Sequence, residues 1–227
     1  PLKRFDIDAA IIFSDILMLP YGLGQKVKFE KNFGPKLENL DLKKIAKLDE
    51  IDFVEKIYPV YKAIKKVSSD SIVKNKNTIG FVGAPWTLLV YMINLKSPKK
   101  DLNKNFFKDE FLINRILLLI EKFLKVHIKN QIDNGANVIQ IFDSWAGLLE
   151  EKDLPNYIYT PTLNLVEYVK INLSDDDGQK QFADYNKICI DKGYEGIMVK
   201  PIGGLYECKR STLWLKVKPF IEVSLTV

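Results

Sequence analysis

The sequence predicts an α/β fold with a parallel sheet over most of its length, followed by a smaller, mainly antiparallel β segment. Two observations predict the first part: short, wholly apolar runs recur along the chain, and long segments of helical periodicity separate them. Strands that are apolar on both faces and alternate with helices are typical of parallel sheets. After residue 173 the pattern changes to short β-like runs with turns between them, which favours antiparallel pairing.

The first predicted strand lies in DIDAAIIFSDILML, at residues 6–19, where an apolar run ends in Ser-Asp. A turn-rich stretch, PYGLGQKV, follows it. Residues 42–67 have apolar positions at a mostly helical spacing, which we expect to be interrupted near Pro59 because proline lacks a backbone donor. The second predicted strand is in TIGFVGAPW, at residues 78–86, and it leads through a Gly/Pro turn into a helix.

The longest predicted helix spans residues 107–133 and ends at Asn134–Gly135, since glycine commonly follows the last turn of a helix. The third predicted strand, NVIQIFDSW, comes directly after it, and residues 161–170 suit a helix with proline in its first turn. Further on, a short amphipathic helix is predicted around Phe182 and Cys189. Three β-like runs then close the chain: EGIMVK, LWLKVK and IEVSLTV.

Two of the three predicted strands end in an aspartate, Asp15 and Asp143. The carboxyl ends of parallel strands meet at one edge of the sheet, and in β/α barrels that edge carries the active site. We therefore expect both aspartates to lie near one mouth, together with the GAPW turn. The alternative for each aspartate alone is a helix cap, which is the commoner role.

The composition limits the classes of function. The chain has 227 residues and a formal net charge of +5, from 34 basic and 29 acidic residues, and such a modest excess is weak evidence for nucleic-acid binding. His127 is the only histidine, and we expect it to be a half-buried helix residue, so a histidine-based triad or zinc cluster is excluded. Cys189 and Cys208 are interpreted as reduced thiols of a cytoplasmic protein, and no apolar run is long enough to span a membrane.

Residues 1 to about 170 resemble the uroporphyrinogen decarboxylase family, through PLKRFDIDAAIIFSDIL, IGFVGAPWTLLVYMI and NGANVIQIFDSWAG in the family's order. The resemblance implies a (β/α)8 (TIM) barrel, here partial, in a commonly dimeric enzyme that uses no metal or organic cofactor. That family removes the four acetate carboxyl groups of uroporphyrinogen III and so produces coproporphyrinogen III for haem synthesis.

The same resemblance implies the site residues. Asp15 would face the pyrrole N–H groups and stabilise the positive charge that develops when a pyrrole ring is protonated at carbon. Ile11 and Phe13 would line the same pocket, and Tyr91 would hydrogen-bond a substrate carboxylate. Judged without the resemblance, Tyr91 is more simply a half-buried residue of a helix.

The resemblance also predicts a truncated enzyme. The chain begins with proline and ends inside an apolar run, so we interpret it as a fragment. The family's arginine-rich, RQAGRY-like motif and its Gly-His-Gly-type loop do not occur in the sequence. About half of the barrel would be present, with open strand edges, and we expect the chain alone to be inactive.

The last part of the chain resembles another family, the adenylation domain of compact ATP-dependent DNA ligases, through GYEGIMVK and YECKRSTLWLKVKP. The resemblance implies that Glu195 helps to hold a metal ion. It also implies that four basic residues bind the nucleotide, because their positive charge offsets the negative charge of the phosphates: Lys200, Arg210, Lys216 and Lys218. ATP, Mg²⁺ and nicked DNA would be the ligands. The Lys-x-Asp-Gly motif whose lysine receives AMP does not occur, so self-adenylation is not expected.

We therefore divide the chain into a decarboxylase-like partial barrel (residues 1–171), a seam or linker (172–180) and a partial ligase-like domain (181–227). Natural fusions join whole domains, so two incomplete flanks indicate a chimera. Three interpretations stay open. The first, favoured by coverage, is a decarboxylase fragment with foreign sequence attached. The others are a ligase fragment, and a non-enzymatic remnant that binds a tetrapyrrole or associates with itself.

Overall fold

The computed structural model describes residues 2–5, 7–98, 102, 106–166 and 173–191, together with the backbone of 197–199 and 215–217. The chain divides into two compact units, Pro1–Glu167 and Tyr168–Val227. The units are described one after the other.

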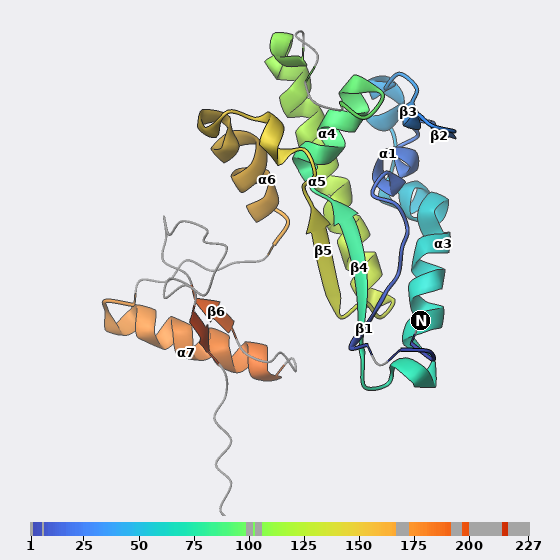
Figure 1. Ribbon diagram of the computed structural model, residues 1–227. Helices are drawn as coiled ribbons and strands as arrows, with labels where there is room; N and C mark the ends of the chain where they lie inside the picture. Colours follow the sequence, from blue (N-terminus) through green and yellow to red (C-terminus); the bar gives the residue numbers. More distant parts are fainter. Residues whose placement is uncertain are drawn as a thin grey trace, which may run out of the picture. The chain divides into compact units, whose positions relative to one another are not determined.

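A parallel sheet organises the first unit (Figure 1). Its strands lie in the order β1-β4-β5, with bounds β1 (Ala9–Ile11), β4 (Asn77–Gly83) and β5 (Val138–Phe142). Both pairings of the central strand β4 are parallel, which confirms the three predicted strands and the predicted α/β fold. Among the described residues the sheet is open and does not close into a barrel.

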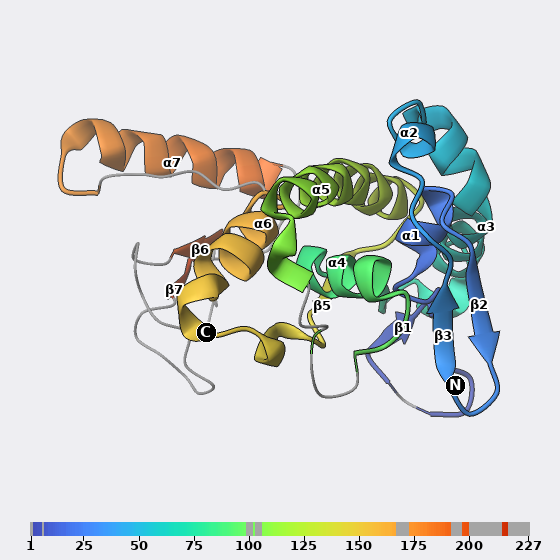
Figure 2. The same ribbon diagram turned by 90° about the horizontal axis from the view of Figure 1, so that it is seen from above.

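Helices pack on one face of this sheet (Figure 2). α3 (Glu50–Ser68) and α5 (Glu110–Asp133) contact β4, and α4 (Pro85–Asn94) follows β4 directly and packs on α5. Large side chains fill the space between these elements and are fully buried, among them Phe53, Trp86 and Phe123. Burial of such rings is the main source of stability that the fold has available.

Shorter elements connect these parts of the first unit. They are α1 (Met18–Gly22), the antiparallel hairpin of β2 (Val27–Glu30) and β3 (Gly34–Leu37), α2 (Leu42–Ile45), and single turns at Ser71–Val73, Phe106–Lys108, Ala146–Leu148 and Glu151–Asp153. The β2–β3 hairpin was not predicted. α1 lies partly in the stretch interpreted as turn-rich.

The predicted interruption near Pro59 is wrong, because α3 runs without a break through it from Glu50 to Ser68. Pro59 removes the hydrogen bond to the Glu55 carbonyl, but both residues are exposed, so water can solvate that carbonyl. The opposite face of the helix buries a full apolar stripe, comprising Phe53, Ile57, Val60, Tyr61 and Ile64. Tertiary packing therefore outweighs the local cost of proline.

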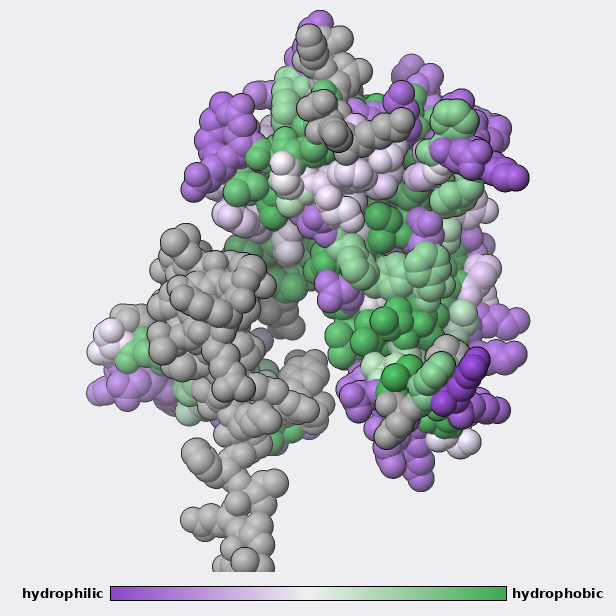
Figure 3. All heavy atoms as spheres, in the orientation of Figure 1, coloured by the Kyte–Doolittle hydropathy of each residue, from purple (hydrophilic) through white to green (hydrophobic). Residues whose placement is uncertain are grey.

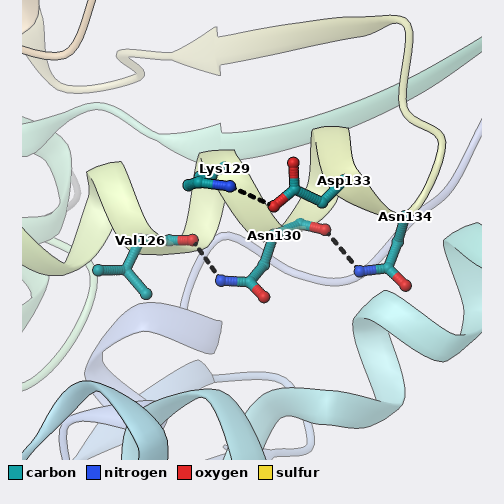
Figure 4. Close-up of polar contacts among 5 residues, drawn as sticks. All are labelled: Val126, Lys129, Asn130, Asp133 and Asn134. Carbon is teal, nitrogen blue, oxygen red and sulfur yellow. Dashed lines mark hydrogen bonds and ion pairs between the residues drawn. The ribbon is translucent and has the colours of Figure 1, made fainter.

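The predicted end of the longest helix is confirmed, and two asparagines complete its last hydrogen bonds (Figure 4). The Asn130 side chain donates to the Val126 carbonyl at 2.9 Å, and the Asn134 side chain donates to the Asn130 carbonyl at 2.8 Å. An exposed ion pair joins Lys129 to Asp133 one turn further on. The Asn134 backbone N–H also donates to the Asn130 carbonyl, at 3.2 Å, so the asparagine side chains add second hydrogen bonds to carbonyls near the end of the helix.

The helix predicted over residues 161–170 differs in extent. A π-helical turn, η5 (Pro155–Tyr159), leads into α6 (Thr160–Leu163), and a turn follows at Asn164–Leu165. Pro161 has no N–H for the ordinary helical hydrogen bond to the Tyr157 carbonyl. This accounts for the π-helical turn just before it, in which hydrogen bonds span five residues. Residues 167–170 of the predicted helix lie outside the described residues.

In the second unit, α7 (Asp176–Asp191) confirms the predicted amphipathic helix. Asp175 caps it, because its Oδ1 accepts the Gly178 N–H at 2.7 Å, so the acidic stretch forms the start of a helix. Cys189 is buried. β6 (Ile197–Val199) pairs with β7 (Leu215–Val217) antiparallel.

Candidate active site

The carboxyl edge of the sheet brings together three chain segments. They leave β1, β4 and β5 and comprise residues 12–17, residues 84–85 and residues 143–145. Because all three strands are parallel, these segments meet at one edge. The two aspartates singled out in the sequence, Asp15 and Asp143, are both in them.

Asp15 is held in an unusual backbone conformation. Its φ is +58°, in the left-handed region that aspartate tolerates better than most residues. Its Oδ1 accepts the Leu17 N–H at 2.8 Å, so the carboxylate also shapes the turn into α1. Asp15 does not cap α1, because Leu17 precedes the helix and no side chain bonds its first turn, and one oxygen of the carboxylate keeps capacity for a ligand.

Gly83, the last residue of β4, lets this turn lie close to the sheet. A Cβ at this position would be 3.2 Å from Cβ of Ile16 and 2.9 Å from Cδ2 of Leu88. A larger residue would therefore push the segment that carries Asp15 away from the strand end. The sequence gives no direct signal for this contact, beyond the glycine itself.

Ile11 and Phe13 lie on the face of the sheet that α3 and α5 do not cover. Their side chains are 66% and 80% exposed. The Phe13 ring is 5.5 Å from Phe81, whose ring is 5.4 Å from Phe142, so a row of aromatic rings runs from the segment after β1 across β4 to β5. Hydrophobic residues gather on this face in Figure 3. The surface offers flat, apolar contact area next to Asp15.

Asp143 belongs to a side-chain network with α4. The Thr87 hydroxyl donates to Asp143 Oδ1 at 2.7 Å and accepts the Trp145 N–H at 3.1 Å. Burial raises the pKa of the Asp143 carboxyl, and the Thr87 hydrogen bond opposes that effect only in part. Thr87 and Trp145 were not predicted as site residues, because their contact joins positions far apart in the sequence.

Three buried polar atoms at this edge have no hydrogen-bond partner among the described residues. They are Ser14 Oγ, Asp143 Oδ2 and Trp145 Nε1. An unpaired buried polar atom costs roughly 1–3 kcal/mol, so such atoms are expected where a ligand or water supplies the missing bond. The set contains both acceptors and donors.

Tyr91 lies on α4 and is half buried. Its ring meets the Trp145 indole edge to face, with centroids 6.0 Å apart. Within the described residues no hydrogen bond links Tyr91 to Asp15. The structure thus joins Tyr91 to the segment after β5, whereas Ile11, Phe13 and Asp15 follow β1.

His127 is not part of this edge. It is 2% exposed, so the expected half-buried position is corrected to a fully buried one, and it contacts Tyr61 and Gln131 in the core. Burial lowers its pKa to about 4. A buried, neutral imidazole with two side-chain partners has a structural role.

The ligase-like candidates fall almost entirely outside the described residues. Glu195, Lys200, Arg210 and Lys218 lie there, and Lys216 is placed only by the backbone of β7. Among the residues that are described, no group of three or more acidic, histidine or cysteine side chains is arranged to hold a metal ion. In the same part of the chain, no helix is both long and apolar enough to cross a membrane.

Comparison with protein families gives one match, which runs through the candidate site. The model of the family described as uroporphyrinogen decarboxylase (URO-D) matches residues 1–175. The region after residue 175 has no support from these comparisons as a ligase segment.

Curated relatives agree with this match. A uroporphyrinogen decarboxylase of Rickettsia bellii is 40% identical over 173 residues, which are 75% of this chain and 50% of that protein. One of Orientia tsutsugamushi is 42% identical over 177 residues, again 75% of this chain and 50% of the relative. The chain thus spans about half the length of these relatives.

Proposed function

The chain belongs to the uroporphyrinogen decarboxylase family, and on that basis we propose that its first unit carries part of a uroporphyrinogen-binding surface centred on Asp15. Its length makes it a decarboxylase-related segment, about half of the relatives it matches. The complete reaction, loss of the four acetate carboxyl groups, is proposed for an enzyme of full length.

The observation that carries the proposal is that Asp15 lies in the segment after β1, two residues from the exposed ring of Phe13. A tetrapyrrole has flat apolar rings and inward-facing N–H groups. Phe13 and Ile11 offer exposed apolar area for the rings. The Asp15 carboxylate, fixed by the Leu17 N–H, offers an acceptor for the pyrrole N–H groups.

The chemistry needs such an acceptor. When an acetate side chain loses CO₂, the electron pair left behind must enter the pyrrole ring, which accepts it if the ring has first been protonated at carbon. That protonation makes the ring cationic. A carboxylate fixed before the reaction stabilises the developing positive charge without having to reorganise. No metal or organic cofactor has a part in this proposal.

Tyr91 is proposed to donate its hydroxyl to a substrate carboxylate. The packing of its ring against Trp145 supports this role, because such a contact restricts the positions open to the hydroxyl before a ligand binds. We expect binding without turnover by this chain, because the other half of the relatives' length is not among the matched residues.

The test measures binding of uroporphyrin III, the fluorescent oxidised form of the substrate, by fluorescence titration. Asp15→Asn removes the charge but keeps an oxygen for the Leu17 N–H, so the turn should persist. We expect roughly ten- to hundredfold weaker binding, because a hydrogen bond to a charged group is worth about 1.5–3 kcal/mol.

Asp70→Asn is the matched control. Asp70 also accepts an N–H two residues on, from Ile72 at 3.0 Å, but it precedes β4 and so lies toward the opposite edge of the sheet. Binding should be unchanged in this variant. If Asp15→Asn binds as tightly as the control, the proposed site is refuted.

For residues 181–227, the ligase-like hypothesis rests on the sequence resemblance alone, as does the proposed division at residues 172–180. We expect no AMP-lysine adduct when the chain is incubated with ATP and Mg²⁺, because the Lys-x-Asp-Gly motif does not occur. Adduct formation, detected by mass spectrometry, would revive the ligase interpretation.

A further inference from the structure

We propose that Thr87 is a positioning residue, which acts through Trp145 to fix Tyr91 for ligand binding. This inference rests on the proposed role of Tyr91. Thr87 is 0% exposed, and its hydroxyl bonds outside its own helix, to Asp143 and to the Trp145 N–H.

The backbone of Trp145 is held at both of its polar groups by consecutive residues of α4. Thr87 accepts its N–H at 3.1 Å, and the Trp86 indole N–H donates to its carbonyl at 2.9 Å. These two hydrogen bonds tie the Trp145 backbone to α4 and restrict its movement.

Because Trp145 packs against Tyr91, the hydrogen bonds to the Trp145 backbone also limit where the Tyr91 ring can lie. Thr87 and Tyr91 are one helical turn apart, so they share a face of α4. Trp145 is bound by the first and packs its indole against the second, 6.0 Å between centroids at an interplanar angle of 64°. Loss of the Thr87 hydroxyl removes the hydrogen bond that holds the Trp145 N–H, and so loosens the residue whose indole packs against Tyr91.

Asp143 completes the arrangement from the other side. Its Oδ1 fixes the hydroxyl hydrogen of Thr87, so that the oxygen presents its lone pairs to the Trp145 N–H. Removing the hydroxyl would take from Asp143 Oδ1 and the Trp145 N–H, both part-buried, the partner that the structure gives them. The backbone segment after β5 would then relax to find other partners.

The experiment is a double-mutant cycle on uroporphyrin III affinity, with Thr87→Val and Tyr91→Phe. Valine has the shape of threonine without its hydroxyl. We expect each single variant to bind about three- to tenfold more weakly, as for loss of one hydrogen bond, and the double variant to be no weaker than Tyr91→Phe. Thr87→Ser keeps the hydroxyl and should restore wild-type affinity.

The outcomes separate this inference from the proposed function. If neither Asp15→Asn nor Tyr91→Phe weakens binding, the proposed site is wrong. The positioning role alone is overturned if Tyr91→Phe weakens binding but Thr87→Val does not. It is also overturned if the double variant loses affinity by the product of the two single factors.

A second variant covers the case in which Thr87→Val does not fold. Trp145→Leu keeps the Trp145 backbone bonds and removes the indole next to Tyr91. We expect it to weaken binding to the same degree as Tyr91→Phe and to add nothing to it. A multiplicative effect in this cycle would also contradict the proposal.

Discussion

The phenol oxygen of Tyr61 lies 2.9 Å from Nδ1 of His127, and this buried hydrogen bond joins α3 to α5. The neighbouring Gln131 contacts the other ring nitrogen. Its Nε2 donates to the Phe81 carbonyl at 3.2 Å and lies 3.3 Å from His127 Nε2. With the Gln131 amide in this orientation, its nitrogen can only donate to His127 Nε2, an arrangement that places the imidazole proton on Nδ1, facing Tyr61.

This arrangement predicts acid sensitivity. The folded-state pKa of His127 is about 4, below its ordinary value of 6.5, so the unfolded chain binds the proton more tightly. The free energy of unfolding therefore keeps its full His127 contribution above pH 6.5. As the pH falls toward 4, the free energy of unfolding decreases by about 3 kcal/mol. Urea unfolding between pH 7.5 and 4.5 measures it. His127→Asn should show a flatter pH dependence than the wild type, and equal slopes would refute the assignment.

Gly80 is predicted to be essential for the same network. A Cβ at this position would lie 2.2 Å from Gln131 Oε1, and two hydrogen bonds hold that side chain in place. Gly80→Ala should therefore reduce the free energy of unfolding by about 2 kcal/mol. Gly147→Ala is the matched control, since nothing lies within 4 Å of its Cβ position. Equal stability of the two variants would contradict the prediction.

The ionised carboxylate of Asp143 is expected to lower the free energy of unfolding at neutral pH. Its folded-state pKa is raised by burial, so the folded chain binds the proton more tightly, and its contribution becomes unfavourable as the pH rises. Asp143→Asn keeps an acceptor for Thr87 and removes the charge. The variant should melt at a higher temperature than the wild type at pH 7, and this difference should shrink in acid. A lower melting temperature at pH 7 would show that the charge is compensated.

Gly135 is predicted to tolerate no side chain. Its φ is +105°, and an added Cβ would lie 2.3 Å from Ser68 Oγ. Gly135→Ala should therefore cost about 1–3 kcal/mol in stability, measured by urea unfolding. Asp133→Asn, two residues earlier, removes only the exposed ion pair with Lys129 and should cost less than about 0.5 kcal/mol. The reverse order of these effects would contradict the structure.

Local patterns were sufficient to predict the regular elements that form the sheet and the longest helix. Apolar runs marked all three parallel strands, and Asn134–Gly135 marked the end of α5. The same local reasoning was wrong at Pro59, where a buried stripe keeps α3 intact. It also missed the β2–β3 hairpin, in which Asn32 of the turn and Gly34 at the start of β3 have positive φ.

The site was predictable only in its separate parts. Parallel strands ending in Asp15 and Asp143 place both residues at one edge, and this follows from topology. The Thr87 contacts with Asp143 and Trp145 span more than fifty residues and have no periodic signal. A buried threonine hydroxyl finds its partner only when α4 packs beside the segment after β5, so no local pattern could reveal it.

Hydrogen–deuterium exchange with and without uroporphyrin III tests the central claim, that the carboxyl edge of this sheet binds a tetrapyrrole. The account predicts slower exchange in the segments at residues 13–17 and 143–145, with no change at the α3–β4 connection around Asp70. The protection should be lost in Asp15→Asn. No protection at saturating uroporphyrin, or protection confined to α7, would contradict it.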